Sequence, residues 1–151
     1  MLGIATILAV AAVPVFSNLV LESRMNAAIS TTMHAVNLAR QFSATRSEAV
    51  SLCGIGASGS CSGSPDWSEG LVVSAGPDGY RHRLGLAAAN GAHIRSNRTT
   101  LEFEAGTGYA TPATVTICDR RGARAARSVI VSRSGRPRSS TRDGSDRSLS
   151  C

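Results

Sequence analysis

The chain begins with an apolar stretch in which no charged residue precedes Glu22. This stretch is roughly 20 residues long, about the length that an α-helix needs to cross the hydrocarbon core of a membrane. Beyond Glu22 apolar residues recur at intervals of three and four, and no Gly or Pro interrupts residues 17–52. The pattern therefore predicts one helix of roughly 75 Å, membrane-spanning over 1–21 and amphipathic over 22–52.

Two other interpretations of this opening stretch compete with a continuous helix. A secretory signal peptide begins with basic residues and ends at a small-residue cleavage site, but no Lys or Arg precedes Arg24. A simple membrane anchor is usually followed by a polar linker, whereas the helical pattern here runs on into the rest of the chain. Pro14 lies inside the apolar part, where we expect it to kink the helix rather than end it.

After a Gly/Ser-rich loop at 53–65, the chain alternates apolar and polar residues in short runs bounded by turn residues. Leu101 and Phe103 share one face of one such run, and Val115 and Ile117 share one face of another. We expect turns at 76–79 and 119–122 and strands at 66–74, 81–86, 92–95, 99–104, 113–118 and 127–133. The predicted fold class is α+β, with an antiparallel sheet of a β-rich domain, 53–151, laid against the amphipathic half of the helix.

Composition adds a strong basic bias to this picture. The formal net charge is +6 and all 16 basic residues are Arg, whose planar guanidinium suits phosphate or carboxylate. Aromatic residues make up only 4% of the chain, so its core must be built from Val, Ile, Leu and Ala. Nine Arg and three Asp lie between Asp119 and Arg147, and that stretch alone carries the whole net charge.

The centre of this basic stretch follows the last predicted strand and reads Gly135-Arg136-Pro137-Arg138. In an extended segment, side chains two residues apart lie on one side and could hold successive phosphates. Two or three phosphate contacts would give weak, salt-sensitive binding without sequence preference. The alternative is a solvated tail, because almost nothing apolar follows residue 133, and such a tail is held only if Cys151 is bonded.

The four cysteines, Cys53, Cys61, Cys118 and Cys151, permit three disulfide connectivities. An even count behind an N-terminal membrane segment suggests an oxidising compartment such as the bacterial periplasm. We expect Cys53–Cys61, which closes a local loop, and Cys118–Cys151, which ties the C-terminal tail to a strand; each should stabilise by roughly 2–4 kcal/mol. A zinc site is the competing interpretation, but no Cys-x-x-Cys and no paired His supports it.

Residues that would carry catalysis or hold a cofactor are missing from the sequence pattern. Gly54, Gly56 and Gly59 form a formal G-x-G-x-x-G, but it follows a helix and lies between two cysteines, so it does not predict a dinucleotide site. The histidines, His34, His82 and His93, lack the partners of a metal or nucleophile site. We therefore expect no enzyme activity, cofactor, metal or small-molecule substrate.

Several segments, in order along nearly the whole chain, resemble the GspH/FimT family of type IV pilins and type II secretion pseudopilins. The apolar helix with Pro14 is similar to the pilin N-terminal helix. The other matching segments are Leu38-Ala39-Arg40, Thr45-Arg46-Ser47-Glu48-Ala49-Val50, Trp67-Ser68-Glu69-Gly70, Ile117-Cys118-Asp119-Arg120-Arg121-Gly122, and the stretch from Ala126 through Arg127 to Arg138.

The resemblance implies a pilin fold and a subunit held in the inner membrane by a single pass, with its domain in the periplasm. It implies assembly with other pilins or pseudopilins through the N-terminal helix. FimT-like members are implicated in binding DNA for natural transformation through Gly-Arg-x-Arg, which Gly135, Arg136 and Arg138 match. On this hypothesis Arg133 helps to bind DNA, as do the residues of a second basic cluster, Arg120, Arg121 and Arg124.

The alternative within the same family is a structural subunit without a role in DNA binding. FimU-like members act in the tip and priming complex of the pilus, and H-type pseudopilins lie at the tip of the secretion pseudopilus. Pilin precursors also carry a basic leader, a Gly-Phe cleavage site and a nearby glutamate. We expect these features upstream of Met1, because the sequence shown begins inside the apolar stretch.

Overall fold

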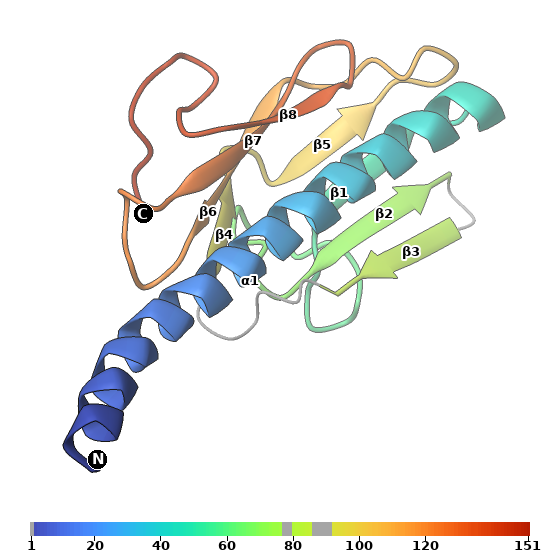
Figure 1. Ribbon diagram of the computed structural model, residues 1–151. Coiled ribbons are helices and arrows are strands. Elements are labelled where there is room, and N and C mark those ends of the chain that lie inside the picture. Colours follow the sequence, from blue (N-terminus) through green and yellow to red (C-terminus); the bar gives the residue numbers. More distant parts are fainter. Residues whose placement is uncertain (1, 77–79, 86–91) are drawn as a thin grey trace.

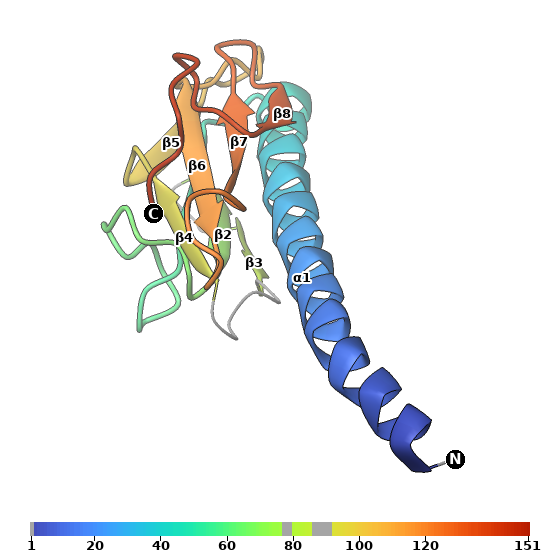
Figure 2. The same cartoon turned by 60° about the vertical axis from the view of Figure 1, so that its left-hand side comes forward.

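The computed structural model describes residues 2–76, 80–85 and 92–151, with side chains from residue 16 onward. Its first element is a single helix, α1 (Leu2–Arg46), whose 45 residues span about 68 Å. The C-terminal half of α1 lies against the rest of the molecule, and its N-terminal part projects away from it (Figures 1 and 2). The helix continues through the position of Pro14 and curves towards its N-terminal end (Figure 2).

In the described part of the chain, no helix combines the length and apolar character needed to cross a membrane. The predicted membrane-spanning segment at 1–21 includes residues 1–15, whose side chains lie outside that part.

The predicted end of the helix near residue 52 is wrong. The helix ends at Arg46, and Ser47 adopts a left-handed backbone conformation with a φ of 53°. Residues 50–54 form a strand, β1 (Val50–Gly54), that pairs with one strand on each side. Val50 and Leu52 are fully buried in this strand. Their apolar side chains therefore belong to a central strand and not to a last turn of the helix.

The strands form two four-stranded antiparallel sheets, where the sequence pattern predicted one. The first sheet has the order β3-β2-β1-β5 and contains β2 (Leu71–Ala75), β3 (Tyr80–Leu84) and β5 (Thr100–Phe103) beside β1. The second has the order β4-β6-β7-β8 and consists of β4 (His93–Ser96), β6 (Ala113–Cys118), β7 (Arg127–Val131) and β8 (Pro137–Ser140). The predicted antiparallel packing against the helix is confirmed, since both sheets lie on one side of α1 (Figure 2).

One continuous core joins α1 to both sheets. Small residues on the buried helix face, including Ala28, Ala35 and Ala39, let the helix backbone approach the strands closely. Aliphatic side chains supply most of the rest, as the low aromatic content predicts, and Trp67 and Phe103 are the large aromatic residues buried among them. The helix position is therefore set by close packing against the strands along the whole amphipathic segment.

Most predicted strands occur within a residue or two of their expected positions. The stretch predicted as a strand at 66–74 forms one only from Leu71, because Asp66 makes an isolated bridge and residues 67–70 form a turn. Residues 77–79 of the turn expected at 76–79 and residue 86 of the strand expected at 81–86 lie outside the described residues. The turn at 119–122 closes through the N–H of Gly122, which donates to the carbonyl of Asp119 over 2.9 Å.

The sequence pattern also suggested a tail after residue 133, and for residues 137–140 this interpretation is wrong. Residues Pro137–Ser140 form β8, which pairs along β7 with Pro137 opposite Val131 and Arg138 opposite Ile130. The remaining residues cross the outer face of the second sheet, the face away from α1 (Figure 2). Disulfides join Cys53 to Cys61 and Cys118 to Cys151, the pairing expected from the sequence.

Candidate nucleic-acid interface

The Gly-Arg-x-Arg segment lies at the turn between β7 and β8, which we call the Arg hairpin (residues 132–138). The N–H of Ser132 donates to the carbonyl of Arg136 over 3.1 Å, and the N–H of Gly135 donates to the carbonyl of Ser132 over 2.9 Å. The hydroxyl of Ser132 accepts from the N–H of Arg136 over 3.3 Å. These bonds hold the basic residues on an ordered turn rather than on a free end.

The glycine of this motif has a steric role in the structure. Gly135 is buried and has a φ of 70°, a conformation that non-glycine residues rarely adopt. A Cβ at this position would overlap the carbonyl oxygen of Gly108 and lie 3.0 Å from Cδ of Arg40. Because glycine has no side chain, the Arg hairpin can rest directly on α1 and on the loop between β5 and β6.

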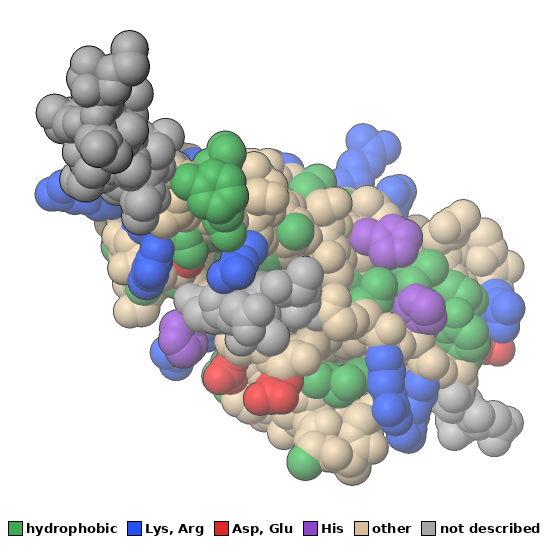
Figure 3. Space-filling view, turned by 60° about the horizontal axis from the view of Figure 1, so that its bottom comes forward, with side chains coloured by type: hydrophobic (Ala, Val, Ile, Leu, Met, Phe, Trp, Pro, Cys, Tyr) green, Lys and Arg blue, Asp and Glu red, His purple; other side chains and the backbone are tan. Residues whose placement is uncertain are grey.

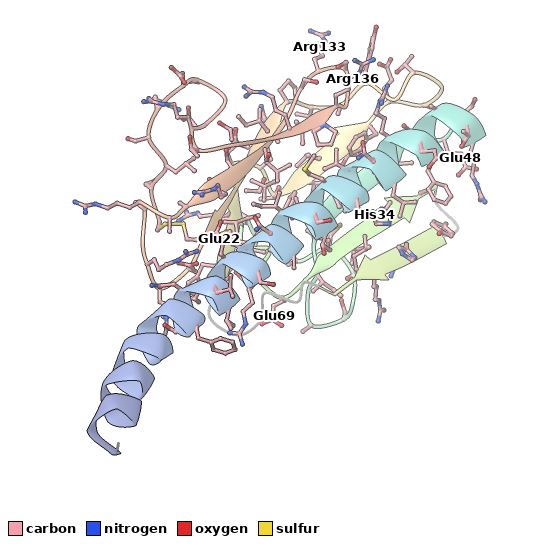
Figure 4. All side chains as sticks on the ribbon, in the orientation of Figure 1. Glu22, His34, Glu48, Glu69, Arg133 and Arg136 are labelled. Atoms are coloured by element: carbon pink, nitrogen blue, oxygen red, sulfur yellow. A yellow bond between two sulfur atoms is a disulfide. The ribbon has the colours of Figure 1, made fainter. Side chains whose placement is uncertain are left out.

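The loop between β5 and β6, residues 104–110, is hydrogen-bonded both to the Arg hairpin and to α1. The N–H of Ala110 donates to the carbonyl of Arg133 over 2.9 Å, which ties the loop to the Arg hairpin. The N–H of Gly106 donates to the carbonyl of Ser43 over 2.8 Å, which ties it to the end of α1. The basic residues of the hairpin are thus presented on a surface braced by the helix, near its C-terminal end (Figure 4).

The side chains of Arg133, Arg136 and Arg138 are all exposed. Within the described residues, no carboxylate forms an ion pair with any of these three guanidinium groups. The nearest acidic residue along the neighbouring loop, Glu104, accepts a hydrogen bond from the hydroxyl of Thr107 instead. Three unpaired cations at one end of the domain make a surface suited to a polyanion.

The second predicted cluster lies elsewhere. Arg120, Arg121 and Arg124 are on the loop between β6 and β7, at the opposite end of β7 from the Arg hairpin. A strand of five residues separates the two clusters by about 17 Å. The structure therefore does not bring all the predicted DNA-binding residues into one site.

Arg121 differs from its neighbours because its guanidinium is already occupied. It donates to the carboxylate of Asp119 over 2.7 to 3.1 Å and to Glu22 of α1 over 3.0 Å. The hydrogen bond from Arg121 holds the pKa of the Asp119 carboxyl below its usual value, and the same bond raises the pKa of Arg121. Arg127 lies 3.8 Å from the other oxygen of Glu22. Arg121 and Arg127 thus fasten the helix to the second sheet.

The outer face of the second sheet carries a groove of about 1260 Å³ beneath the C-terminal residues. Arg138 lines it, together with Arg95 and Arg147. Asp66, Asp119 and Asp143 line it as well, and Asp143 accepts a hydrogen bond of 2.9 Å from Arg147. Opposite charges are balanced along this groove, so it does not extend the unpaired basic surface of the hairpin.

Other basic residues lie on the far flank of α1. Arg81 and Arg83 are exposed on β3, at the edge of the first sheet, whereas the hairpin belongs to the second sheet (Figure 1). The view from the side of β2 and β3 shows basic side chains scattered among apolar, acidic and uncharged ones (Figure 3). These two residues therefore provide a matched control for the charge of the Arg hairpin.

The structure describes exposed positions for all three histidines, His34, His82 and His93. Among the described residues, no group of three His, Cys, Asp or Glu side chains could hold a metal ion.

Two residues of this surface were not identified from the sequence. Arg40 is a helical residue, and Tyr109 lies in a loop of small and polar residues. The sequence around each of them does not indicate a place at this surface, because both come next to the hairpin only when the helix, the loop and the hairpin pack together. Leu38-Ala39-Arg40 matches a family segment, but that match assigns no role to its arginine.

A long helix whose second half lies across antiparallel sheets while its first half projects is the type IV pilin fold. Two crystal structures of the type IV minor pilin FimU from Pseudomonas aeruginosa share it. One has 19% sequence identity and a TM-score of 0.61, covering 78% of this chain and 88% of that one. The other has 18% identity and a TM-score of 0.58, covering 76% and 91%.

A family model, described as type II transport protein GspH, matches residues 28–135. The chain belongs to this family. The comparison with curated proteins found no match. As a member of the GspH family the chain is a minor pilin or pseudopilin, a structural subunit rather than an enzyme.

Proposed function

We propose that this protein is a minor type IV pilin of the tip or priming complex that binds DNA non-specifically for uptake in natural transformation. Its N-terminal segment holds it in the inner membrane before assembly, with the domain in the periplasm, and then packs against other pilins in the filament. The Arg hairpin supplies the DNA contacts through Arg133, Arg136 and Arg138. Arg120 and Arg124 provide a second, separate contact, while Arg121 is engaged with Asp119 and Glu22.

The observation that carries the proposal is the set of unpaired guanidinium groups on a braced turn. A phosphate that binds here displaces no ion pair of the protein. Ordering the loop costs little on binding, because the turn is already held by its own hydrogen bonds and by the loop at 104–110. Planar guanidinium groups bind phosphate oxygens with two parallel hydrogen bonds, which favours arginine for this task.

Binding through phosphates has a defined salt dependence. Two or three contacts to duplex DNA should give a slope of about −2 to −3 for the logarithm of affinity against the logarithm of salt concentration. Affinity should be similar for unrelated sequences, because phosphate contacts carry no base information.

The test is a fluorescence anisotropy titration of labelled duplex DNA with the full chain in detergent at low salt. We expect Arg136→Gln with Arg138→Gln to weaken binding strongly. The control, Arg81→Gln with Arg83→Gln, removes the same charge from the other flank of α1 and should matter less. Equal losses in both double variants would mean that binding depends on the overall charge of the domain and not on the Gly-Arg-x-Arg segment. A wild-type chain that fails to bind at low salt would reject the DNA role.

A second candidate function is a structural H-type pseudopilin of a type II secretion system. The observation that favours it is the family model, whose description names type II transport. Deletion of the gene in the source bacterium separates the two functions. Loss of protein secretion with normal transformation would support the pseudopilin. Loss of transformation, restored by the wild-type gene but not by the Arg136→Gln, Arg138→Gln variant, would support the DNA-binding pilin.

A further inference from the structure

Tyr109 is an exposed aromatic residue that adjoins the Arg hairpin. The residue is 53% exposed, and the next residue, Ala110, donates its N–H to the carbonyl of Arg133. The loop around it is ordered, because the carbonyl of Tyr109 accepts from the N–H of Glu104 over 2.7 Å and its own N–H donates to the hydroxyl of Thr107. The backbone of Tyr109 is therefore held next to the Arg hairpin, and its ring is exposed to solvent.

The other exposed tyrosine shows what such a ring does when it has partners. Tyr80 stacks on Phe42 with ring centroids 4.7 Å apart, and the guanidinium of Arg46 lies over both rings. Among the described residues, no ring and no guanidinium pairs with Tyr109 in this way. Keeping a large apolar ring in water is unfavourable, so an exposed ring on a loop that is bonded to the Arg hairpin suggests an external partner with a flat apolar face.

Arg40 adds a fourth cation to the same surface. A Cβ at Gly108 would lie 3.0 Å from Cγ of Arg40, and one at Gly135 would lie 3.0 Å from its Cδ. The aliphatic part of Arg40 thus packs between the loop and the hairpin, and the guanidinium, which begins one bond beyond Cδ, lies beside Gly135. No carboxylate of the described residues pairs with it.

We propose that this surface binds single-stranded DNA in preference to duplex, an inference that rests on the DNA-binding function proposed above. Tyr109 stacks on one unpaired base, while Arg40, Arg133 and Arg136 hold the phosphates on either side of it. A base inside a duplex already has both faces stacked and offers none to an aromatic ring. Aromatic stacking on a cationic surface is a general way to bind single strands without sequence preference.

The experiment compares two fluorescently labelled probes with the full chain in detergent, an oligo-dT of about 15 nucleotides and a duplex of the same length. We expect the wild type to bind the oligo-dT at least about fivefold more tightly, the lower end of what one base–aromatic stack supplies. Tyr109→Ser should weaken oligo-dT binding at least about fivefold and duplex binding by less, so that the preference is lost. Tyr109→Phe, which keeps the ring, should retain the preference. The matched control Tyr80→Ser removes an exposed ring on the other flank and should change neither affinity.

A variant of Arg40 separates charge from packing. Arg40→Met keeps an aliphatic side chain between Gly108 and Gly135 but loses the charge, so it should weaken binding of both probes and lower the salt slope by about one contact. Unchanged affinity in this variant would show that Arg40 only supports the hairpin, and would remove it from the proposal.

A second readout detects the stack directly. An oligo-dT with one 2-aminopurine should lose base fluorescence on binding the wild type and Tyr109→Phe, but not Tyr109→Ser. Equal affinity for the two probes, or a preference that survives in Tyr109→Ser, would overturn the inference while leaving duplex binding by the Arg hairpin intact. If neither probe binds, the proposed function itself fails.

Discussion

Replacing Gly135 with alanine tests how closely the Arg hairpin approaches the rest of the domain. The substitution has two separable effects. The backbone at residue 135 has a φ of 70°, and a non-glycine residue in this region costs roughly 1–2 kcal/mol. The new Cβ would also overlap the carbonyl oxygen of Gly108 and press on Arg40, and such overpacking typically costs about 1–3 kcal/mol. The expected total is a loss of about 2–5 kcal/mol in the free energy of unfolding.

The chain contains a matched control for the first effect. Gly122 has a φ of 75°, and a Cβ added there would meet nothing within 4 Å. Gly122→Ala should therefore cost only the backbone term, roughly 1–2 kcal/mol. Each substitution also reduces the entropy of the unfolded chain by a similar amount, so that contribution cancels in the comparison. The difference between the two variants, about 1–3 kcal/mol, measures the close approach alone.

The assay is urea unfolding of the full chain in detergent, followed by the fluorescence of Trp67. This residue is the single tryptophan of the chain and is fully buried, so its emission reports on the core. We also expect Gly135→Ala to weaken DNA binding, because the hairpin must move away from the loop that braces it. Equal loss of stability in Gly135→Ala and Gly122→Ala would refute the reasoning, since it would mean that the hairpin does not rest on Gly108.

Three further predictions concern the bonds that hold the domain together. Cys118→Ala with Cys151→Ala removes a disulfide of sequence separation 33 and should cost about 3.7 kcal/mol in the same assay; an unchanged urea midpoint would contradict this. The pKa of Asp119 lies below 3.8 in the folded chain because Arg121 donates to it. The stabilisation that Asp119 contributes is therefore complete above the unfolded pKa and is lost as the pH falls through the folded pKa. Asp119→Asn should therefore flatten the acid side of a curve of stability against pH. A curve identical to that of the wild type would refute this. Glu22→Gln should lower the free energy of unfolding by less than about 1 kcal/mol, because the side chain of Glu22 is 40% exposed. This loss should shrink in high salt. A loss that does not change with salt would show that the ion pairs are not its cause.

The order of amino acids along the chain was enough to predict the features that depend on near neighbours. Apolar residues at helical spacing predicted α1, and strict alternation predicted strands such as β5 and β6. The expected disulfides also followed from position, because one pair is local and the other joins a strand to the chain end. The helix and the strands are largely decided within short stretches of sequence, where periodicity is a reliable guide.

The misplaced helix end and the missed strand had a different origin. Val50 and Leu52 fit a helical continuation as well as they fit a strand. What makes them a strand is pairing with β2 and β5, whose residues lie far along the chain. Residues Pro137–Ser140 have almost no apolar pattern, and they form β8 because the edge of β7 offers free backbone hydrogen-bonding groups.

The candidate site shows the same division between sequence and tertiary structure. The density of arginine near the C-terminus could be counted in the sequence, but the sequence does not tell a paired arginine from an unpaired one. Arg121 is occupied because Glu22, 99 residues away, lies beside it in the folded chain. The hairpin rests on Gly108 and Arg40 because two glycines leave room there. Local sequence therefore determined the elements and the total charge. Long-range packing decided which charges face solvent, because ion pairing and close contact depend on distances in space rather than along the chain.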